Sequence, residues 1–266
     1  RVLVLLDEDE GGRDSQVKEP VYGAPARWIN PDMQEEAALR GLTVVSPTEV
    51  LATHLLEVIK RNFGRLLTFR SLRKILDEFT NLSDPKRAEM NRRMLDELVP
   101  DKVPFELLQS VLRLLLEEQV SIRNLPLILE AIAEARPRMA TPEEITEHVR
   151  HRLGFQIIAE TRRIDGTLPL VQLAPAWETL FQEYAITGDS GLQDIALPPD
   201  EFSRLAGSVA EKIAKASESG IYPAIVTSTR RRRFVRTVLS AKGILNPVYS
   251  FDEIGTSAKP SLVGMA

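Results

Sequence analysis

Residues 104–135, PFELLQSVLRLLLEEQVSIRNLPLILEAIAEA, decide the fold class of this chain. Apolar residues recur in them at helical spacing, and Pro104 and Pro126 stand where helices begin. The pattern predicts two helices, over 104–119 and 125–135, joined by a short connection. We expect their shared apolar face to be core. The residues assigned to it are Ile122, Leu125, Leu129 and Ile132.

Helical spacing continues on both sides of this segment, and most breaks contain proline. Further helices are predicted over 69–79, 85–97 and 142–152. The last begins with Thr141-Pro142-Glu143-Glu144, a capping box in which side chains satisfy free backbone N–H groups. Residues 68–152 are therefore predicted to form a small helical bundle.

The segment before the bundle mixes short strands with helices. Residues 2–6 and 42–45 have the length and composition of strands, and a helix is expected from Asn30-Pro31 to Gly41. Ser46-Pro47-Thr48-Glu49 is a second capping box and starts a helix that runs to about Phe63. We expect the apolar stripe of this helix to face a core. The stripe consists of Leu51, Leu55, Val58 and Ile59.

After Gly154 the hydrophobic period changes. Residues 155–164 and 167–173 flank Asp165-Gly166, which predicts a β-hairpin with a two-residue turn. Helices over 176–184, 199–218 and 230–242, and strands over 223–227 and 246–250, follow. The small, polar tail from Gly255 is expected to fray. The fold class is α+β with several subdomains, in which a helical middle bundle is flanked by small mixed α/β subdomains.

Composition excludes several classes of function. The 34 basic and 38 acidic residues give a net charge of −4, which disfavours a role driven by attraction to nucleic acid or a membrane surface. Without cysteine there are no disulfides, thiol nucleophiles or iron–sulfur clusters. A membrane-spanning helix needs about 18 or more consecutive apolar residues, and the sequence contains no such run. Because the chain starts at Arg1 inside a strand pattern, we expect it to be part of a larger protein whose preceding region carries a membrane anchor.

The sequence carries no motif of an enzyme active site. A phosphate-binding loop, a dinucleotide-binding fingerprint and a nucleophile elbow are all missing. His148 and His151 are three positions apart on a predicted helix, but no third metal ligand lies nearby, so we interpret them as surface histidines. No metal, no cofactor and no enzymatic activity are predicted.

Arg230–Arg233 form the densest basic run, and Arg236 follows one turn later. Four consecutive arginines point all round a helix, so we expect packing and ion pairing. A winged-helix nucleic-acid-binding regulator is the alternative, because three helices precede the expected hairpin. Its third helix, over 142–152, carries three glutamates in its first half, where they would repel phosphate.

Five segments occur in an order that resembles one family. They are EPVYGAPARWI (19–29), GLTVVSPTEVLATHL (41–55), ELVP (97–100), VL (111–112) and EQVSIRNLPLILEA (118–131). Over residues 19–254 the chain resembles the cytoplasmic C-terminal domain of the FlhA/SctV export-gate family of type III secretion. The ELVP and WI blocks favour the flagellar branch, FlhA, over the injectisome branch, SctV.

The resemblance implies an inner-membrane protein with this part in the cytoplasm, where four subdomains assemble into a nine-membered ring. The second subdomain would cover 1–46 and the tail of the interrupted first 47–66, while the third and fourth would cover 67–154 and 155–266. The implied partners are export chaperones with bound substrates and other export-apparatus proteins. The implied function is a docking platform that hands substrates to the membrane channel, with an injectisome gate as the alternative.

The resemblance also implies a chaperone-docking depression at Glu19, Tyr22, Gly23 and Thr53. Glu19 and Tyr22 stand where the family has Asp and Phe, which leaves the chemistry similar and the affinity open. We expect Tyr22 to be an aromatic anchor, Thr53 a small polar wall and Glu19 a carboxylate at the rim. Two neighbouring motif residues are interpreted as structural: Trp28 as core, and Arg123 as a bridge to a carboxylate on another helix.

Overall fold

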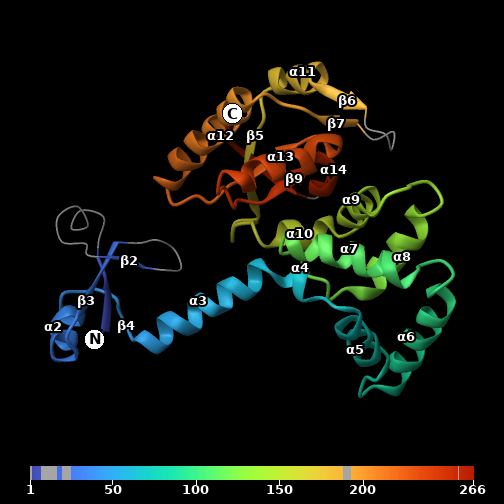
Figure 1. Ribbon diagram of the computed structural model, residues 1–266, viewed down its shortest axis with the longest axis horizontal. Coiled ribbons are helices and arrows are strands. Elements are labelled where there is room, and N and C mark those ends of the chain that lie inside the picture. Colours follow the sequence, from blue (N-terminus) through green and yellow to red (C-terminus); the bar gives the residue numbers. More distant parts are fainter. Residues whose placement is uncertain (1, 7–16, 20–24, 188–192, 257) are drawn as a thin grey trace. The chain divides into compact units, whose positions relative to one another are not determined.

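The computed structural model describes residues 2–6, 17–19, 25–187, 193–256 and 258–266. The chain divides into two compact units, Arg1–Thr68 and Phe69–Ala266 (Figure 1). The expectation of more than one compact unit is confirmed. The finer division into four subdomains stays a prediction.

Unit 1 is a small antiparallel sheet with helices. The strand order is β2-β3-β1-β4. One sheet face packs Val2 and Val4 against Ala37, and the opposite face packs Leu3 against Val50. This alternation along β1 is the two-residue period of a strand buried on both sides. The elements are β1 (Val2–Leu5), β2 (Val17–Lys18), β3 (Pro25–Ile29), η1 (Pro31–Met33), α2 (Gln34–Leu39), β4 (Val44–Val45), α3 (Pro47–Arg61) and α4 (Phe63–Leu66).

The first part of unit 2 is the predicted bundle. Its helices are α5 (Phe69–Thr80), α6 (Pro85–Leu98), α7 (Phe105–Glu117), α8 (Leu125–Ala135), α9 (Pro142–Arg152) and α10 (Gly154–Ala159). Leu125, Leu129 and Ile132 are buried as expected, whereas Ile122 is half-buried. The capping boxes at Ser46 and Thr141 are both formed, so the local signals set these two helix starts.

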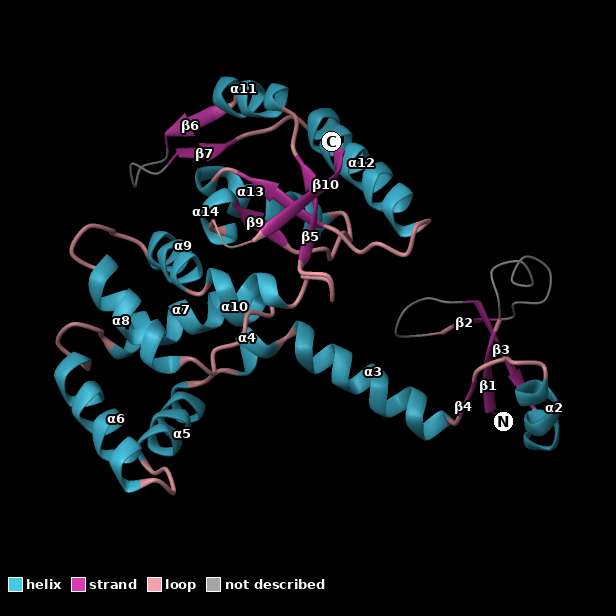
Figure 2. Cartoon of the chain, turned by 180° about the vertical axis from the view of Figure 1, so that it is seen from behind, coloured by secondary structure: helices cyan, strands magenta, loops and turns pink. Residues whose placement is uncertain are grey.

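The second part of unit 2 is a four-stranded parallel sheet in the order β10-β5-β8-β9 (Figure 2). Val171, Ile225 and Val248 face the core under α12 and α13. On the other face the Tyr249 hydroxyl donates to the Ile157 carbonyl of α10 at 3.3 Å. The elements are β5 (Thr167–Gln172), α11 (Pro175–Glu183), β6 (Ala185–Thr187), β7 (Gln193–Ile195), α12 (Pro199–Ser217), β8 (Ala224–Thr227), α13 (Thr229–Ala241), β9 (Val248–Ser250), α14 (Phe251–Ile254) and β10 (Lys259–Met265).

The expected hairpin over 155–173 is wrong. Gly154 starts helix α10 instead, in which the adjacent Ile157 and Ile158 are both buried. The Asp165-Gly166 turn is present, with Gly166 at φ +83° and its N–H donating to the Arg163 carbonyl at 2.9 Å. It connects the end of the helical part to β5, whose partners β8 and β10 are parallel and distant in sequence.

The expectation of a frayed tail is also wrong. Residues 259–265 form β10, an edge strand that pairs with β5 from Lys259↔Thr167 to Met265↔Gln172. Pro260 is tolerated because an edge strand does not need every N–H. Backbone bonds with β5, rather than buried side chains, specify this strand, which explains why its composition resembles a loop.

Candidate functional site

The predicted docking residues belong to unit 1, and the structure describes two of the four. Glu19 directly follows β2, and Thr53 lies in the middle of α3. Tyr22 and Gly23 lie outside the described residues. The docking site as a whole therefore stays a prediction.

The segments that carry Glu19 and Thr53 converge on one face of the small sheet. Val17 of β2 and Val50 of α3 pack into the same apolar cluster, around Leu3. Glu19 stands two residues after Val17, which is one strand period. Thr53 stands three residues after Val50, which is about one helical turn. The segments that carry the two described docking residues thus meet at the cluster around Leu3.

The burial of these two residues corrects one expectation. Thr53 is exposed, in agreement with a wall that a partner can reach. Glu19 is only 8% exposed, so it is not a rim carboxylate but a buried acid beside the cluster. A carboxylate taken out of water requires polar partners, which gives Glu19 a structural role as well.

The expected core stripe of α3 is wrong. Leu51 and Leu55 are 67% and 55% exposed, and Leu56 and Val58 are exposed as well. The reason is that only the first turn of α3, at Val50, packs on the sheet. Beyond that turn an apolar surface runs along the helix.

Trp28 is a residue of this region that sequence reasoning assigned to the core. It pairs with Leu3 across β1 and β3 and packs only partly buried against the same cluster. Trp28 stands two residues after Ala26 on β3, so the two side chains lie on the same face of the sheet, and Ala26 is fully buried in this cluster. This spacing is the sequence signal that predicts the position of Trp28. Trp28 is therefore a half-buried aromatic side chain in the same cluster as Val17 and Val50.

The arginine run at the start of α13 divides into two kinds of residue. Arg231 and Arg232 are 2% and 0% exposed, whereas Arg230 and Arg233 are exposed. Arg231 Nε donates to Glu178 at 3.0 Å. The expectation of packing and intramolecular pairing is confirmed for these two buried arginines. Arg233 lies 3.5 Å from Glu143 at the surface.

Arg232 is the centre of an ionic cluster formed by Arg150, Arg232, Glu118, Glu147 and Glu253. Its Nη1 donates to Glu118 at 2.6 Å, and its Nε donates to Glu147 at 2.6 Å. Arg150 Nε donates to Glu253 at 2.6 Å, and Arg150 Nη1 approaches Glu118 at 3.3 Å without hydrogen-bond geometry. The cluster joins α9 and the residue after α7 to α13 and α14.

The charges in the cluster control its protonation. Burial raises the pKa of the Glu118 carboxyl, but the neighbouring Arg150 and Arg232 more than offset this and lower it to about 2. Burial also lowers the pKa of Arg232, and the hydrogen bonds to Glu147 and Glu118 raise it well above its ordinary value. Glu118 and Arg232 are therefore both charged at neutral pH.

The remaining expectations concern Arg123, the histidines and the membrane. Arg123 is exposed and has no carboxylate partner in the part of the chain that the structure describes, so the predicted bridge is wrong. His148 lies 3.3 Å from Glu134, and His151 is exposed. The described residues contain no group of metal-ligating side chains. Among the described helices, none combines the length and apolarity that crossing a membrane requires.

Comparison with known proteins supplies the family. The model of the FHIPEP family matches residues 1–259. The chain belongs to the FHIPEP family. Within it, the chain is 38% identical over 249 residues to the flagellar biosynthesis protein FlhA of Caulobacter vibrioides and 32% identical over 250 residues to that of Treponema pallidum. These alignments cover 94% and 93% of the chain but only 34% of each relative, so the chain spans about one third of their length.

Solved structures with a similar fold were also found. The nonameric SctV-C of EPEC superposes with a TM-score of 0.75 at 17% identity, covering 100% of this chain and 78% of that one. The CdsV protein of Chlamydia pneumoniae gives 0.71 at 21% identity, covering 99% and 74%. At these identities the likeness shows the fold, which confirms the predicted α+β class with a helical bundle between mixed parts.

Proposed function

We propose that this chain is a cytoplasmic docking platform of a flagellar type III export gate. It binds export chaperones that carry their substrates and passes those substrates toward a membrane channel. The family match over residues 1–259 is the observation that carries this proposal. The same match supports a role in a secretion apparatus without enzymatic activity.

The proposed docking site comprises Glu19, Tyr22, Gly23 and Thr53. It is supported by the convergence of β2 and α3 on the cluster around Leu3, which brings the segments of Glu19 and Thr53 together. The structure adds half-buried Trp28 to this face. An aromatic side chain beside a small polar wall suits a helical chaperone that inserts one apolar residue.

The flagellar branch is favoured over the injectisome branch by sequence. The curated relatives at 38% and 32% identity are flagellar, whereas the similar injectisome domains are 17–21% identical. A nonameric ring and contact with further export components are part of the proposal, because one similar structure is described as nonameric and another as a CdsV and CdsO complex.

Two sequence features favoured the nucleic-acid alternative, the expected hairpin and the basic run, and neither has the structure that this alternative requires. The wing would need a hairpin after the third helix, but residues 154–159 form α10 and β5 pairs in a parallel sheet. The basic run would need free arginines, but Arg231 and Arg232 are buried in ion pairs.

Calorimetric titration with an export chaperone bound to its substrate tests the docking site. Tyr22→Ala removes an aromatic anchor and should cost about 2 kcal/mol, or roughly thirtyfold in affinity. Thr53→Met should block binding by filling the depression, and Tyr22→Phe should be mild. Thr48→Met places the same side chain on the exposed first turn of α3 and serves as the matched control. Unchanged affinity in folded Tyr22→Ala and Thr53→Met variants would refute the site.

A further inference from the structure

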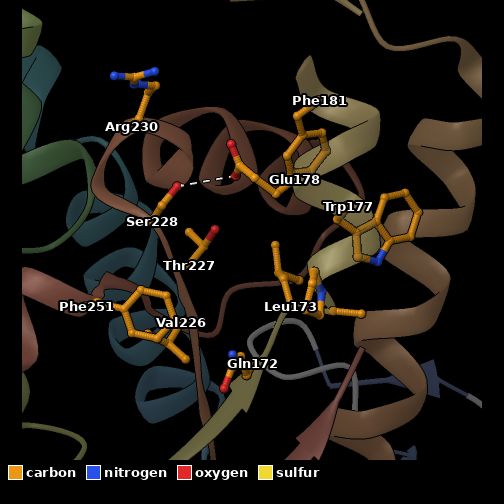
Figure 3. Close-up of a pocket in the computed structure, with 12 residues that line it drawn as sticks. Gln172, Leu173, Trp177, Glu178, Phe181, Val226, Thr227, Ser228, Arg230 and Phe251 are labelled. Atoms are coloured by element: carbon orange, nitrogen blue, oxygen red, sulfur yellow. Dashed lines mark hydrogen bonds between the residues drawn. The ribbon is translucent and has the colours of Figure 1, made fainter. Parts of the chain in front are cut away.

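A cavity of about 360 Å³ lies at the carboxyl ends of β5 and β8 in unit 2. Gln172 ends β5 and Thr227 ends β8, and both line the cavity together with the first turns of α11 and α13 (Figure 3). In parallel sheets, ligands bind outside the carboxyl ends of the strands. This cavity therefore occupies the position that parallel α/β sheets use for ligand binding.

One side of the cavity is apolar. Trp177 and Phe181 of α11 and Leu173 after β5 form its wall, and Phe251, which is 52% exposed, stands at its rim (Figure 3). The volume suits one bulky apolar side chain together with a terminal peptide unit.

The other side of the cavity is the start of α13. Ser228 does not cap this helix; its hydroxyl lies 3.5 Å from Glu178 Oε2 instead. The N–H groups of Thr229 and Arg230 have no acceptor in the described part of the chain, as is usual for a first turn without a cap. The helix dipole adds positive potential at this point, so the first turn favours an anionic group.

The Thr227 side chain is an independent sign of a ligand. The residue is only 6% exposed, lines the cavity, and its hydroxyl is not hydrogen-bonded to any described residue. This hydroxyl is therefore available for a hydrogen bond with a ligand in the cavity.

Arg230 is the positively charged residue on the polar side of the cavity. It lines the cavity, is exposed, and makes no ion pair with any described residue. Two carboxylates lie near this turn: Glu178 is engaged by Arg231 Nε at 3.0 Å, and Asp252 accepts a hydrogen bond from the Thr229 hydroxyl. Arg230 is the cation of the cavity lining that is left without an ion-pair partner among the described residues.

We propose that this cavity captures the free carboxyl terminus of a protein segment whose last residue is bulky and apolar. The terminal carboxylate is bound by the first-turn N–H groups of α13, the Thr227 hydroxyl and Arg230, and the last side chain enters the apolar part. Such capture of a terminal carboxylate by free backbone N–H groups is a general mode of peptide recognition.

A protein segment fits better than a small molecule because the cavity opens into a wider groove. The two share Ser228, Arg230 and Phe251, and the groove continues past Arg233 and Thr237 on α13. Residues preceding the terminus can lie along this groove. The inference goes beyond the proposed docking function and does not depend on Glu19 or Thr53.

Fluorescence anisotropy with the 266-residue chain and labelled peptides tests the proposal. The probe is a Gly-Ser-Gly-Ser-Leu peptide with a free carboxyl terminus, and its matched control is the same peptide with a carboxamide. The free acid should bind at least tenfold more tightly, because charge-assisted hydrogen bonds are lost in the amide. Arg230→Ala should weaken binding of the acid about tenfold and Thr227→Val severalfold. Lys215→Ala, which removes an exposed positive charge on α12 away from both the cavity and the groove, should change it less than twofold.

Equal binding of acid and amide, no binding of the acid, or full affinity of the acid for a folded Arg230→Ala variant would overturn the proposal. An amidated peptide with an internal Asp that binds as tightly as the free acid would also overturn it, because the surface would then recognise an acidic segment and not a terminus.

Discussion

Helices α3 and α13 distribute their side chains in opposite ways. Helix α3 exposes leucines, with Leu51 and Leu55 more than half accessible, whereas α13 buries two arginines, Arg231 and Arg232. The difference comes from what lies opposite each helix. Within unit 1 only the first turn of α3 packs on the sheet. Helix α13 packs on β9, and its Arg232 forms ion pairs with Glu118 and Glu147. Burial thus follows the neighbours that a helix acquires and not its own hydrophobicity.

Replacing the central arginine is the strongest test of this comparison. Arg232→Met should lower the free energy of unfolding by about 3–5 kcal/mol, because it leaves buried carboxylates without their counter-charge. Urea unfolding followed by circular dichroism measures this. Arg230→Met, on the exposed side of the same helix, should change it by less than about 0.5 kcal/mol. Equal effects of the two variants would show that the ionic cluster does not stabilise unit 2.

The pH dependence of stability tests the same cluster without mutation. The folded-state pKa of Glu118 is about 2, below its ordinary value of 4.5. Its contribution is therefore complete above pH 4.5 and is lost as the pH falls from 4.5 toward 2, on the order of 3 kcal/mol in total. Unfolding measured at pH 6 and pH 3 should show about two thirds of this loss, and Glu118→Gln should reduce it. A pH dependence that is identical in both proteins would contradict the assignment.

Two glycines, Gly154 and Gly207, test whether the neighbours of a helix also decide which backbone positions tolerate a side chain. A methyl group at this position would lie 2.2 Å from the Glu253 carbonyl oxygen, so Gly154→Ala should cost about 1–3 kcal/mol by separating α10 from α14. Gly207, inside α12, has open space around it, and Gly207→Ala should stabilise by about 0.5–1 kcal/mol. Thermal unfolding of the two variants should move the midpoint in opposite directions. An unchanged or raised midpoint for Gly154→Ala would show that α10 and α14 tolerate a wider separation.

The smallest effect is expected on α3. Leu55→Gln should change the free energy of unfolding by less than about 0.5 kcal/mol, because this side chain is already 55% exposed. Leu129→Ala, in the fully buried face of α8, should cost about 2–5 kcal/mol under the same conditions. A large loss for Leu55→Gln would mean that the leucines of α3 are covered in solution.

Much of the helical part could be predicted because its signals are local. Proline breaks and capping boxes placed α5 to α9 within one or two residues of their observed ends. Prediction failed where a segment's structure depends on contacts with residues far away in the sequence. The apolar run after Gly154 fits a strand as well as a helix, and its contact with Glu253 comes from a position almost 100 residues later. The tail at 259–265 becomes a strand through β5 alone.

The candidate site shows the same limit. The spacing of Glu19 and Thr53 identified two segments, but the burial of Glu19 depends on how β2 meets the cluster around Leu3. The sequence located the arginine run, but it could not show which of the arginines are buried and which are exposed. Which two of four neighbouring arginines are buried depends on the rotation of α13 against β9 and on carboxylates more than 80 residues away.

The pairing of β10 with β5 has a consequence for synthesis of the protein. Thr167 leaves the ribosome 92 residues before its partner Lys259, and at ordinary elongation rates this interval lasts roughly 5–20 s. During that time β5, whose residues 168–171 are buried in the finished sheet, has an unpaired edge. Such edges are templates for unwanted strand pairing. The nascent chain therefore passes through a period of aggregation risk that ends only when β10 has been synthesised and pairs with β5.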